Sequence, residues 1–164
     1  MKRNPVSGER IEELNQIAMD HFWPHNRQAG DMSEETGIKF IVNGKGIWVE
    51  DINGNQWIDT MSGLWLKAIG HGRKEIARAV SSQMNTIAFT PMGSVSPSTV
   101  DLAGRLASLS PDKNSRVFFV SGGSEAVETA LKMAKNYHYN NGEPDRWKII
   151  SRRGSYHGGT YACV

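Results

Sequence analysis

Apolar and polar residues follow two different periods along the first two thirds of the chain. A spacing of three or four, typical of an amphipathic helix, predicts helices at 11–22, 74–87 and 98–109. An alternation of apolar and polar residues predicts three strands, at 38–42, 47–52 and 57–61. Asn43-Gly44 and Asn53-Gly54 separate these strands and favour tight hairpin turns. We therefore expect a small antiparallel sheet with helices before and after it.

The ends of these helices carry their own signals. Pro24 ends the first helix, and the polar segment 26–37 predicts a loop. Ser98 and Asp101 resemble a capping box, which predicts the start of the third helix after a loop at 91–97.

Strand and helix signals alternate in the last third of the chain. The apolar run 117–120 predicts a strand, and Trp147–Ser151 predicts another. Between them an apolar stripe predicts a helix, with Ala126, Val127, Ala130, Leu131 and Ala134 on one side. This alternation predicts an α/β protein with the start of a doubly wound, mainly parallel sheet. Because an unfinished sheet exposes strand edges, we also expect poor solubility or dependence on oligomers.

The first of these strands breaks into Ser121, Gly122, Gly123 and Ser124 just before the helix. A strand, a small-residue corner and a helix together present free backbone N–H groups to an anion, and the helix dipole favours negative charge there. The corner is therefore a candidate phosphate site, and an ordinary βα turn is the alternative. Glu125 and Glu128 suit the helix dipole but would have to point away from a bound phosphate. The corner has neither the Gly-Lys-Ser/Thr ending of a P-loop nor the third glycine of a dinucleotide turn.

A second glycine-rich loop follows the second predicted strand, and it contains Tyr156, His157 and Gly158. Ligands in open α/β sheets collect beyond the carboxyl ends of the strands, so this loop and the corner are expected to lie close together. A flat ring beside a phosphate site suits a flat, phosphorylated cofactor.

Several separated motifs together resemble one family. Phe-Phe-Val-Ser-Gly-Gly-Ser-Glu-Ala-Val-Glu-Thr-Ala-Leu-Lys at 118–132, followed by Tyr-His-Gly at 156–158, closely resembles the class III, or omega, aminotransferases. Upstream, the segments 46–55, 59–65 and 69–73 resemble the N-terminal hairpin of that family and the segment that enters its active site. The resemblance covers nearly the whole chain from Phe22 onward.

The resemblance implies a fold type I enzyme that depends on pyridoxal 5'-phosphate. It implies that 1–70 forms the helix and antiparallel strands of a small lobe, and that 71–164 forms the first part of the large cofactor-binding domain. It further implies an amine or ω-amino acid as donor, a keto acid as acceptor, and a homodimer in the full-length enzyme. The segment Phe89–Gly93 resembles one that reaches the partner subunit's site.

The same resemblance assigns roles to individual residues. Gly123 and Ser124 are expected to hold the cofactor phosphate together with Gly122, which stands where the family commonly has serine. Tyr156 is expected to stack on the pyridine ring, with His157 and Gly158 shaping the loop. The residues expected to line the substrate pocket are Leu64, Trp65 and, where relatives often have an aromatic residue, His25. Val127 stands where many relatives have asparagine.

The catalytic lysine of the family has no counterpart in this chain. In the family, the Schiff-base lysine and the acidic partner of the pyridinium nitrogen lie well downstream of the Tyr156 motif, and this chain stops at Val164. The resemblance therefore implies the N-terminal portion of an aminotransferase, with no catalytic residue here. The alternative is an inactive truncated fragment that retains part of the cofactor site or dimer surface. An aminomutase or decarboxylase of the same class is a third possibility.

Composition adds few constraints. The 19 basic and 17 acidic residues give a formal charge of +2, too balanced to favour nucleic acid or a membrane surface as partner. Cys163 stands alone, which excludes an internal disulfide and fits a cytoplasmic location. The five histidines show no metal-ligand spacing, so no metal is expected. There is no Gly-x-Ser-x-Gly elbow, so a hydrolase triad is not expected.

Overall fold

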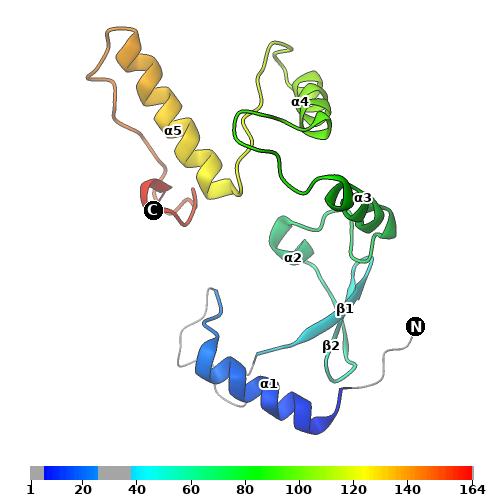
Figure 1. Cartoon of the computed structure of the whole chain (residues 1–164). Helices are drawn as coiled ribbons and strands as arrows, with labels where there is room; N and C mark the ends of the chain where they lie inside the picture. The colour runs from blue at the N-terminus through cyan, green and yellow to red at the C-terminus, as the bar shows by residue number, and fades with distance from the viewer. Residues whose placement is uncertain (1–5, 26–37, 164) are drawn as a thin grey trace. The chain divides into compact units, whose positions relative to one another are not determined.

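The computed structural model describes residues 6–25 and 38–163, and the chain divides into two compact units (Figure 1). The first unit runs to Phe89 and the second begins at Thr90. The lobe boundary expected near residue 70 concerns a complete family member and stays a prediction. The polar loop predicted at 26–37 lies outside the described residues.

Helix α1 spans Gly8–His21. It begins after Ser7, whose hydroxyl accepts a hydrogen bond from the Arg10 amide at 3.3 Å and so caps the first turn. Ala18 is the residue of this helix that is buried. The helix ends at His21, and its C-cap Phe22 lies two residues before Pro24, which agrees with the predicted boundary.

Three antiparallel strands follow, in the order β1 (Ile41–Lys45), β2 (Trp48–Asp51) and β3 (Gln56–Ile58). The meander was predicted, but its first turn was misplaced. Asn43-Gly44 lies inside β1, opposite Glu50 and Val49, and the turn is at Gly46, with φ +59°. The reason is steric: a Cβ on Gly44 would lie 2.8 Å from Cβ of His71, so the glycine serves a close contact and not a turn.

The second turn is where Asn53-Gly54 predicted it, with Gly54 at φ +84°. Asp51 is buried and organises this turn. Its Oδ1 accepts from the amides of Asn53 (3.0 Å) and Asn55 (2.9 Å). Its Oδ2 accepts from Nδ2 of Asn55 and Nε1 of Trp57, both at 3.1 Å. Burial alone would raise the pKa of Asp51, but the hydrogen bonds from Trp57 and the two asparagines outweigh it and lower the pKa.

The strand predicted at 57–61 is shorter than expected, because β3 ends at Ile58. The chain then forms α2 (Ser62–Trp65), which the sequence pattern did not predict. Helix α3 spans Lys74–Thr86 and agrees with the predicted helix.

The second unit contains α4 (Pro97–Leu109), α5 (Gly123–Asn140) and a short 3-10 turn, η2 (Tyr161–Cys163). The capping box predicted at Ser98 is wrong by two residues, because the cap of α4 is Ser96, whose hydroxyl accepts from the Thr99 amide. Pro97 fixes this start, since proline is favoured in the first helical turn. Helix α5 is the one predicted after the glycine corner.

The two predicted parallel strands are not formed within the described residues. Segments 117–120 and 147–151 contain no residue in a strand, and no backbone hydrogen bond joins one segment to the other. A strand is stabilised by the ladder it shares with a neighbour, so an apolar run without that neighbour stays irregular. The apolar residues of these segments favour a strand, but a strand forms only where a neighbouring strand supplies hydrogen-bond partners.

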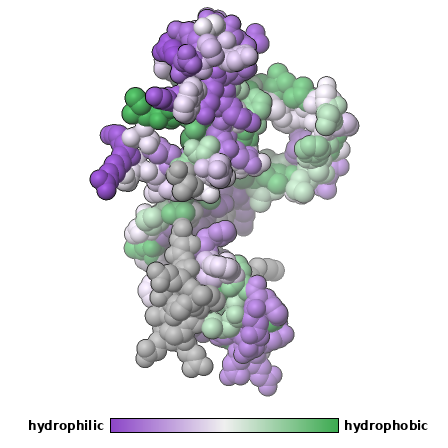
Figure 2. Space-filling view, turned by 90° about the vertical axis from the view of Figure 1, so that its left-hand side faces the viewer, coloured by the Kyte–Doolittle hydropathy of each residue, from purple (hydrophilic) through white to green (hydrophobic). Residues whose placement is uncertain are grey.

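Few residues are buried in the part of the chain that the structure describes: Ala18, Asp51, Gly158 and Cys163. Large apolar side chains from α3, α4 and α5 remain exposed, and hydrophobic and hydrophilic residues are mixed on the face seen in Figure 2. Exposed apolar surface of this extent favours association. The predicted poor solubility or dependence on oligomers agrees with this surface and stays a prediction.

Candidate functional site

The corner at residues 121–124 leaves backbone amides open at the start of α5. Gly122 is extended and precedes the helix without a side-chain cap. Within the described residues, no acceptor binds the amides of Gly122, Gly123 or Ser124. Both glycines are exposed, and a Cβ on either would meet no atom within 4 Å. Open amides at a helix N-terminus form an arrangement that can bind an anion.

The two glutamates of the first turns are oriented by hydrogen bonds. Oε2 of Glu125 accepts from the Ser121 amide at 2.8 Å, so one amide of the corner is already occupied. Oε1 of Glu128 instead accepts from the Ala162 amide at 3.2 Å. The Thr160 hydroxyl, and then the Ala162 amide, lower the pKa of Glu128. Glu128 therefore anchors the turn at 160–162, and Glu125 is the carboxylate beside the corner.

The second glycine-rich loop is hydrogen-bonded to the corner. The Gly159 amide donates to Oγ of Ser124 at 2.9 Å, across 35 residues of sequence. The Cys163 thiol lies 3.5 Å from the carbonyl oxygen of Ser124, and Figure 1 shows this terminal turn beside the start of α5. A Cβ on Gly158 would lie 2.8 Å from Cβ of Cys163 and 2.9 Å from Oγ of Ser124. Glycine at 158, with φ +146°, is what allows this approach.

Tyr156 lies two residues before this contact, and its side chain is 79% exposed. Its hydroxyl is close to Gly159, because a Cβ there would be 3.8 Å from it. His157 is also exposed, and within the described residues neither ring makes a side-chain hydrogen bond or a ring contact. The structure thus brings Ser124 of the first motif next to Gly158 and Gly159 of the second loop, and Tyr156 in that loop stays exposed.

The predicted substrate residues belong to the first unit. Leu64 and Trp65 lie in α2, 51% and 75% exposed, and His25 is exposed just after α1. No hydrogen bond among the described residues joins His25 to either of them. The sequence pattern did not reveal two residues beside α2, Asp59 and His71, which form a hydrogen-bonded pair. Glycines on both sides of His71 were the available signal, since they indicate close backbone approach.

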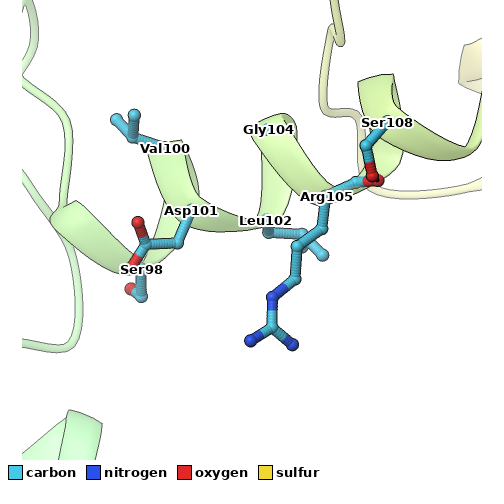
Figure 3. A pocket seen from close by; sticks show the side chains of 7 residues that line it. All are labelled: Ser98, Val100, Asp101, Leu102, Gly104, Arg105 and Ser108. Carbon is cyan, nitrogen blue, oxygen red and sulfur yellow. Dashed lines mark hydrogen bonds between the residues drawn. The ribbon is translucent and has the colours of Figure 1, made fainter.

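Other hollows do not coincide with these residues. The hollow in Figure 3, of about 700 Å³, is lined by residues of α4 alone. Asp101, Leu102 and Arg105 project from one side of that helix (Figure 3). Among the described residues no group of three or more His, Cys, Asp or Glu side chains could hold a metal ion. None of the described helices has the length and apolar character needed to span a bilayer.

The family model for class-III aminotransferases matches residues 30–164. A probable aminotransferase of Mycobacterium tuberculosis is 45% identical over 125 residues, which are 76% of this chain and 27% of that protein. The putrescine–pyruvate aminotransferase of Pseudomonas aeruginosa is 32% identical over 161 residues, or 97% of this chain and 35% of that protein. The chain therefore spans about a third of the length of these curated relatives or less.

Solved structures give the same result. An (S)-enantioselective omega-transaminase from Thermomicrobium roseum is 40% identical, with a TM-score of 0.84. The match covers 90% of this chain and 33% of that one. This likeness confirms the expected α/β fold, the N-terminal part of fold type I, although the parallel strands themselves are not formed in the described residues.

Proposed function

Because the chain belongs to the class-III aminotransferases, we propose that it supplies the phosphate-binding side of a pyridoxal 5'-phosphate site. The enzyme would move an amino group between an amine or ω-amino acid and a keto acid. The name of the Pseudomonas relative, which pairs putrescine with pyruvate, supports such a donor and acceptor. The observation that carries the proposal is the hydrogen bond between the Gly159 amide and the Ser124 hydroxyl, which joins the two motifs.

In this proposal the corner holds the phosphate. The amides of Gly122, Gly123 and Ser124 are directed to the anion, and the dipole of α5 stabilises its charge. Ser124 contributes twice. Its oxygen accepts from Gly159, so its hydroxyl proton is free to be donated to a phosphate oxygen. Gly122 supplies an amide without the hydroxyl that family members commonly have there.

The loop at 156–158 would orient the ring of the cofactor. Tyr156 presents an exposed aromatic face of the kind that stacks on a pyridine ring, and His157 and Gly158 set the path of the loop. Pyridoxal phosphate, when bound, withdraws electrons from the carbon that carries the amino group. Lys132 and Lys135 on α5 are exposed, so we assign binding and orientation to the residues of this chain, and no proton transfer.

Three further assignments complete the proposal. Leu64 and Trp65 would line the substrate pocket, with His25 as a third wall. The complete enzyme would be a cytoplasmic homodimer. The exposed apolar side chains of Phe89 and Met92 fit a segment that reaches the partner subunit.

The test is a titration of the chain with pyridoxal phosphate, followed by absorbance and tryptophan quenching. Ser124→Ala removes one hydrogen-bonding group and should weaken binding by about 0.5–1.5 kcal/mol, which is roughly 2- to 13-fold. Tyr156→Ala should weaken it by a similar or larger factor through lost stacking. Ser81→Ala, an exposed serine of α3, is the matched control and should leave binding unchanged. Equal affinities for all four proteins would contradict the proposal.

The alternative of an inactive fragment makes a separate prediction. Because no buried lysine lies at the corner among the described residues, the chain alone should bind the cofactor without turning over an amine donor and a keto acid. An assay of amino transfer with both substrates and added pyridoxal phosphate measures this. Turnover at an enzymatic rate would show that a group of this chain performs the proton transfer.

A further inference from the structure

A second polar cluster, which the proposed cofactor site does not use, lies in the first unit after β3. Both carboxylate oxygens of Asp59 have a partner. Oδ1 accepts from the Gly63 amide at 3.0 Å, and Oδ2 lies 2.7 Å from Nε2 of His71. The side chains of Asp59 and His71 are only 15% and 21% exposed. The hydrogen bond from Gly63, and then the one to His71, hold the pKa of Asp59 below its ordinary value.

The position of His71 is fixed by the backbone of the hairpin. Its amide donates to the carbonyl of Gly46 at 2.8 Å, and its carbonyl accepts from the Gly46 amide at 3.0 Å. Its side chain lies directly over Gly44, where any Cβ would collide with it. A Cβ on Gly72 would lie 2.8 Å from the carbonyl oxygen of Gly44. Glycines on both sides of the contact thus let the segment lie close to β1 and aim the imidazole at Asp59.

The backbone that Asp59 holds is strained. Ser62, Gly63, Leu64 and Trp65 have φ values of +51°, +60°, +61° and +69°, so α2 is a left-handed turn. Each non-glycine residue in this region costs about 1–2 kcal/mol, and three of these four consecutive residues are not glycine. A hydrogen bond of 2.8 Å from the Trp65 amide to the Met61 carbonyl closes the turn. Backbone strain of this kind persists only where the surroundings hold it, and it gathers at functional sites.

The strained turn carries the two exposed side chains that the family resemblance assigns to the substrate pocket, Leu64 and Trp65. We propose that Asp59 and His71 are positioning residues: Asp59 binds the Gly63 amide, His71 orients Asp59, and together they fix the direction in which Leu64 and Trp65 face the amine substrate. The identity of the substrate rests on the proposed function. The stabilisation of the turn by Asp59 and His71 is independent of the proposed function, so it is tested without cofactor.

A second histidine–carboxylate pair shows what an ordinary pair looks like. Nδ1 of His138 lies 2.7 Å from Oε2 of Glu143, just beyond the end of α5. Glu143 is 43% exposed and also binds Arg146. No left-handed run of non-glycine residues adjoins it in the described part of the chain. The two pairs share their chemistry and distance, so His138→Ala is a matched control for His71→Ala.

The test is a proton–nitrogen NMR spectrum of the chain, with the Trp65 indole resonance assigned by Trp65→Phe. Asp59→Ala and His71→Ala should shift or broaden that resonance. Asp59→Ala should also speed amide exchange at Gly63 by about tenfold, as expected for the loss of one hydrogen bond. Asp59→Asn should restore much of the wild-type spectrum, because its amide oxygen can accept from Gly63 and its nitrogen can donate to His71. His138→Ala should leave Trp65 unchanged.

The indole resonance of Trp57 reports whether the hairpin is intact, because its Nε1 is bound to Asp51 and Lys39 lies over its ring at 3.4 Å. A change at Trp65 with Trp57 unchanged supports the proposal. A Trp65 resonance that stays in place in Asp59→Ala and His71→Ala overturns it. A shift of the Trp57 resonance together with that of Trp65 in both Asp59→Ala and Asp59→Asn also overturns it. The pair would then stabilise the first unit as a whole and not the turn in particular. A failure to bind pyridoxal phosphate would affect only the proposed function.

Discussion

The turn at α2 and the corner before α5 both place a special backbone where function is proposed, but they treat their polar groups in opposite ways. At α2, Asp59 uses both carboxylate oxygens within the protein, on the Gly63 amide and on His71. At the corner, the amides of Gly122, Gly123 and Ser124 have no acceptor among the described residues. The first region is closed and strained, and the second is open and unstrained.

This difference separates two ways of building a site. Satisfied polar groups stabilise one geometry, so the cluster at Asp59 is suited to hold neighbouring side chains in place. Unsatisfied, exposed amides keep their hydrogen-bonding capacity for a ligand. The closed region is therefore expected to respond to substitution by losing structure, and the open region by losing affinity.

The largest effect is expected from adding a methyl group to the closed region. Gly72→Ala places a Cβ 2.8 Å from the Gly44 carbonyl oxygen at a residue with φ +70°. The strain and the forced displacement should together destabilise the first unit by about 2–5 kcal/mol. Urea unfolding followed by tryptophan fluorescence measures this change.

Gly46→Ala is the matched control for that substitution. Gly46 also has positive φ, +59°, but a Cβ there meets nothing within 4 Å. Its cost should be limited to the backbone, about 1–2 kcal/mol. Equal losses of unfolding free energy in Gly72→Ala and Gly46→Ala would show that the close approach of Gly72 to β1 does not contribute to stability.

Gly158→Ala should have the next largest effect, on affinity. The new Cβ would lie 2.9 Å from Oγ of Ser124 and 2.8 Å from Cβ of Cys163, so the loop must move away from the corner. Overpacking of this kind costs about 1–3 kcal/mol, and pyridoxal phosphate should bind roughly 5- to 150-fold more weakly. Gly159→Ala, whose Cβ meets only the Tyr156 hydroxyl at 3.8 Å, should bind almost as wild type. Equal affinities of Gly158→Ala and Gly159→Ala for pyridoxal phosphate would show that the approach of this loop to Ser124 does not contribute to binding.

Protonation of Asp59 at low pH should weaken the turn at α2. The pKa of Asp59 is lowered from 3.8 by its bond from Gly63 and then by His71. A carboxylate with a depressed pKa stabilises the fold fully above its ordinary value and loses that contribution as the pH falls through the folded value. The Trp65 resonance should therefore be steady down to about pH 4 and change below it. Asp59→Asn should abolish that acid-induced change, and its persistence would mean that another group is responsible.

The smallest effect is expected at Glu125. Its carboxylate accepts from the Ser121 amide and brings negative charge to the corner. Glu125→Gln keeps an acceptor and removes the charge, so pyridoxal phosphate should bind about 2- to 5-fold more tightly at low salt. Glu12→Gln on α1 is the control. Unchanged or weaker binding in Glu125→Gln would show that the carboxylate does not oppose the anion.

The features that the sequence predicted correctly are those set by neighbouring residues, namely the helices and the small-residue corner. The corner could be found because its small residues are consecutive and stand before a strong apolar stripe. Helices α1, α3 and α5 follow their apolar spacing. Contacts between distant segments were not predictable: Asp59 and His71 are twelve residues apart, and the glycine that admits the imidazole, Gly44, stands in a third segment.

The errors have the same origin. Asn43-Gly44 has the composition of a turn, but the steric demand of His71 places the glycine inside a strand. The runs at 117–120 and 147–151 have the composition of strands, but a strand needs a partner to complete its hydrogen bonds, and the described residues do not supply one. The left-handed turn at α2 follows a sequence, Ser-Gly-Leu-Trp, that has only one residue favouring positive φ.

The most direct test of the phosphate corner compares pyridoxal phosphate with pyridoxal, which lacks the phosphate. Both are added to the isotope-labelled chain, and the backbone amide resonances of Gly122, Gly123, Ser124 and Gly159 are followed by NMR. We predict that pyridoxal phosphate shifts these resonances and that pyridoxal at the same concentration leaves them in place. Equal shifts with both compounds, or no shift with pyridoxal phosphate, would contradict a phosphate site at this corner.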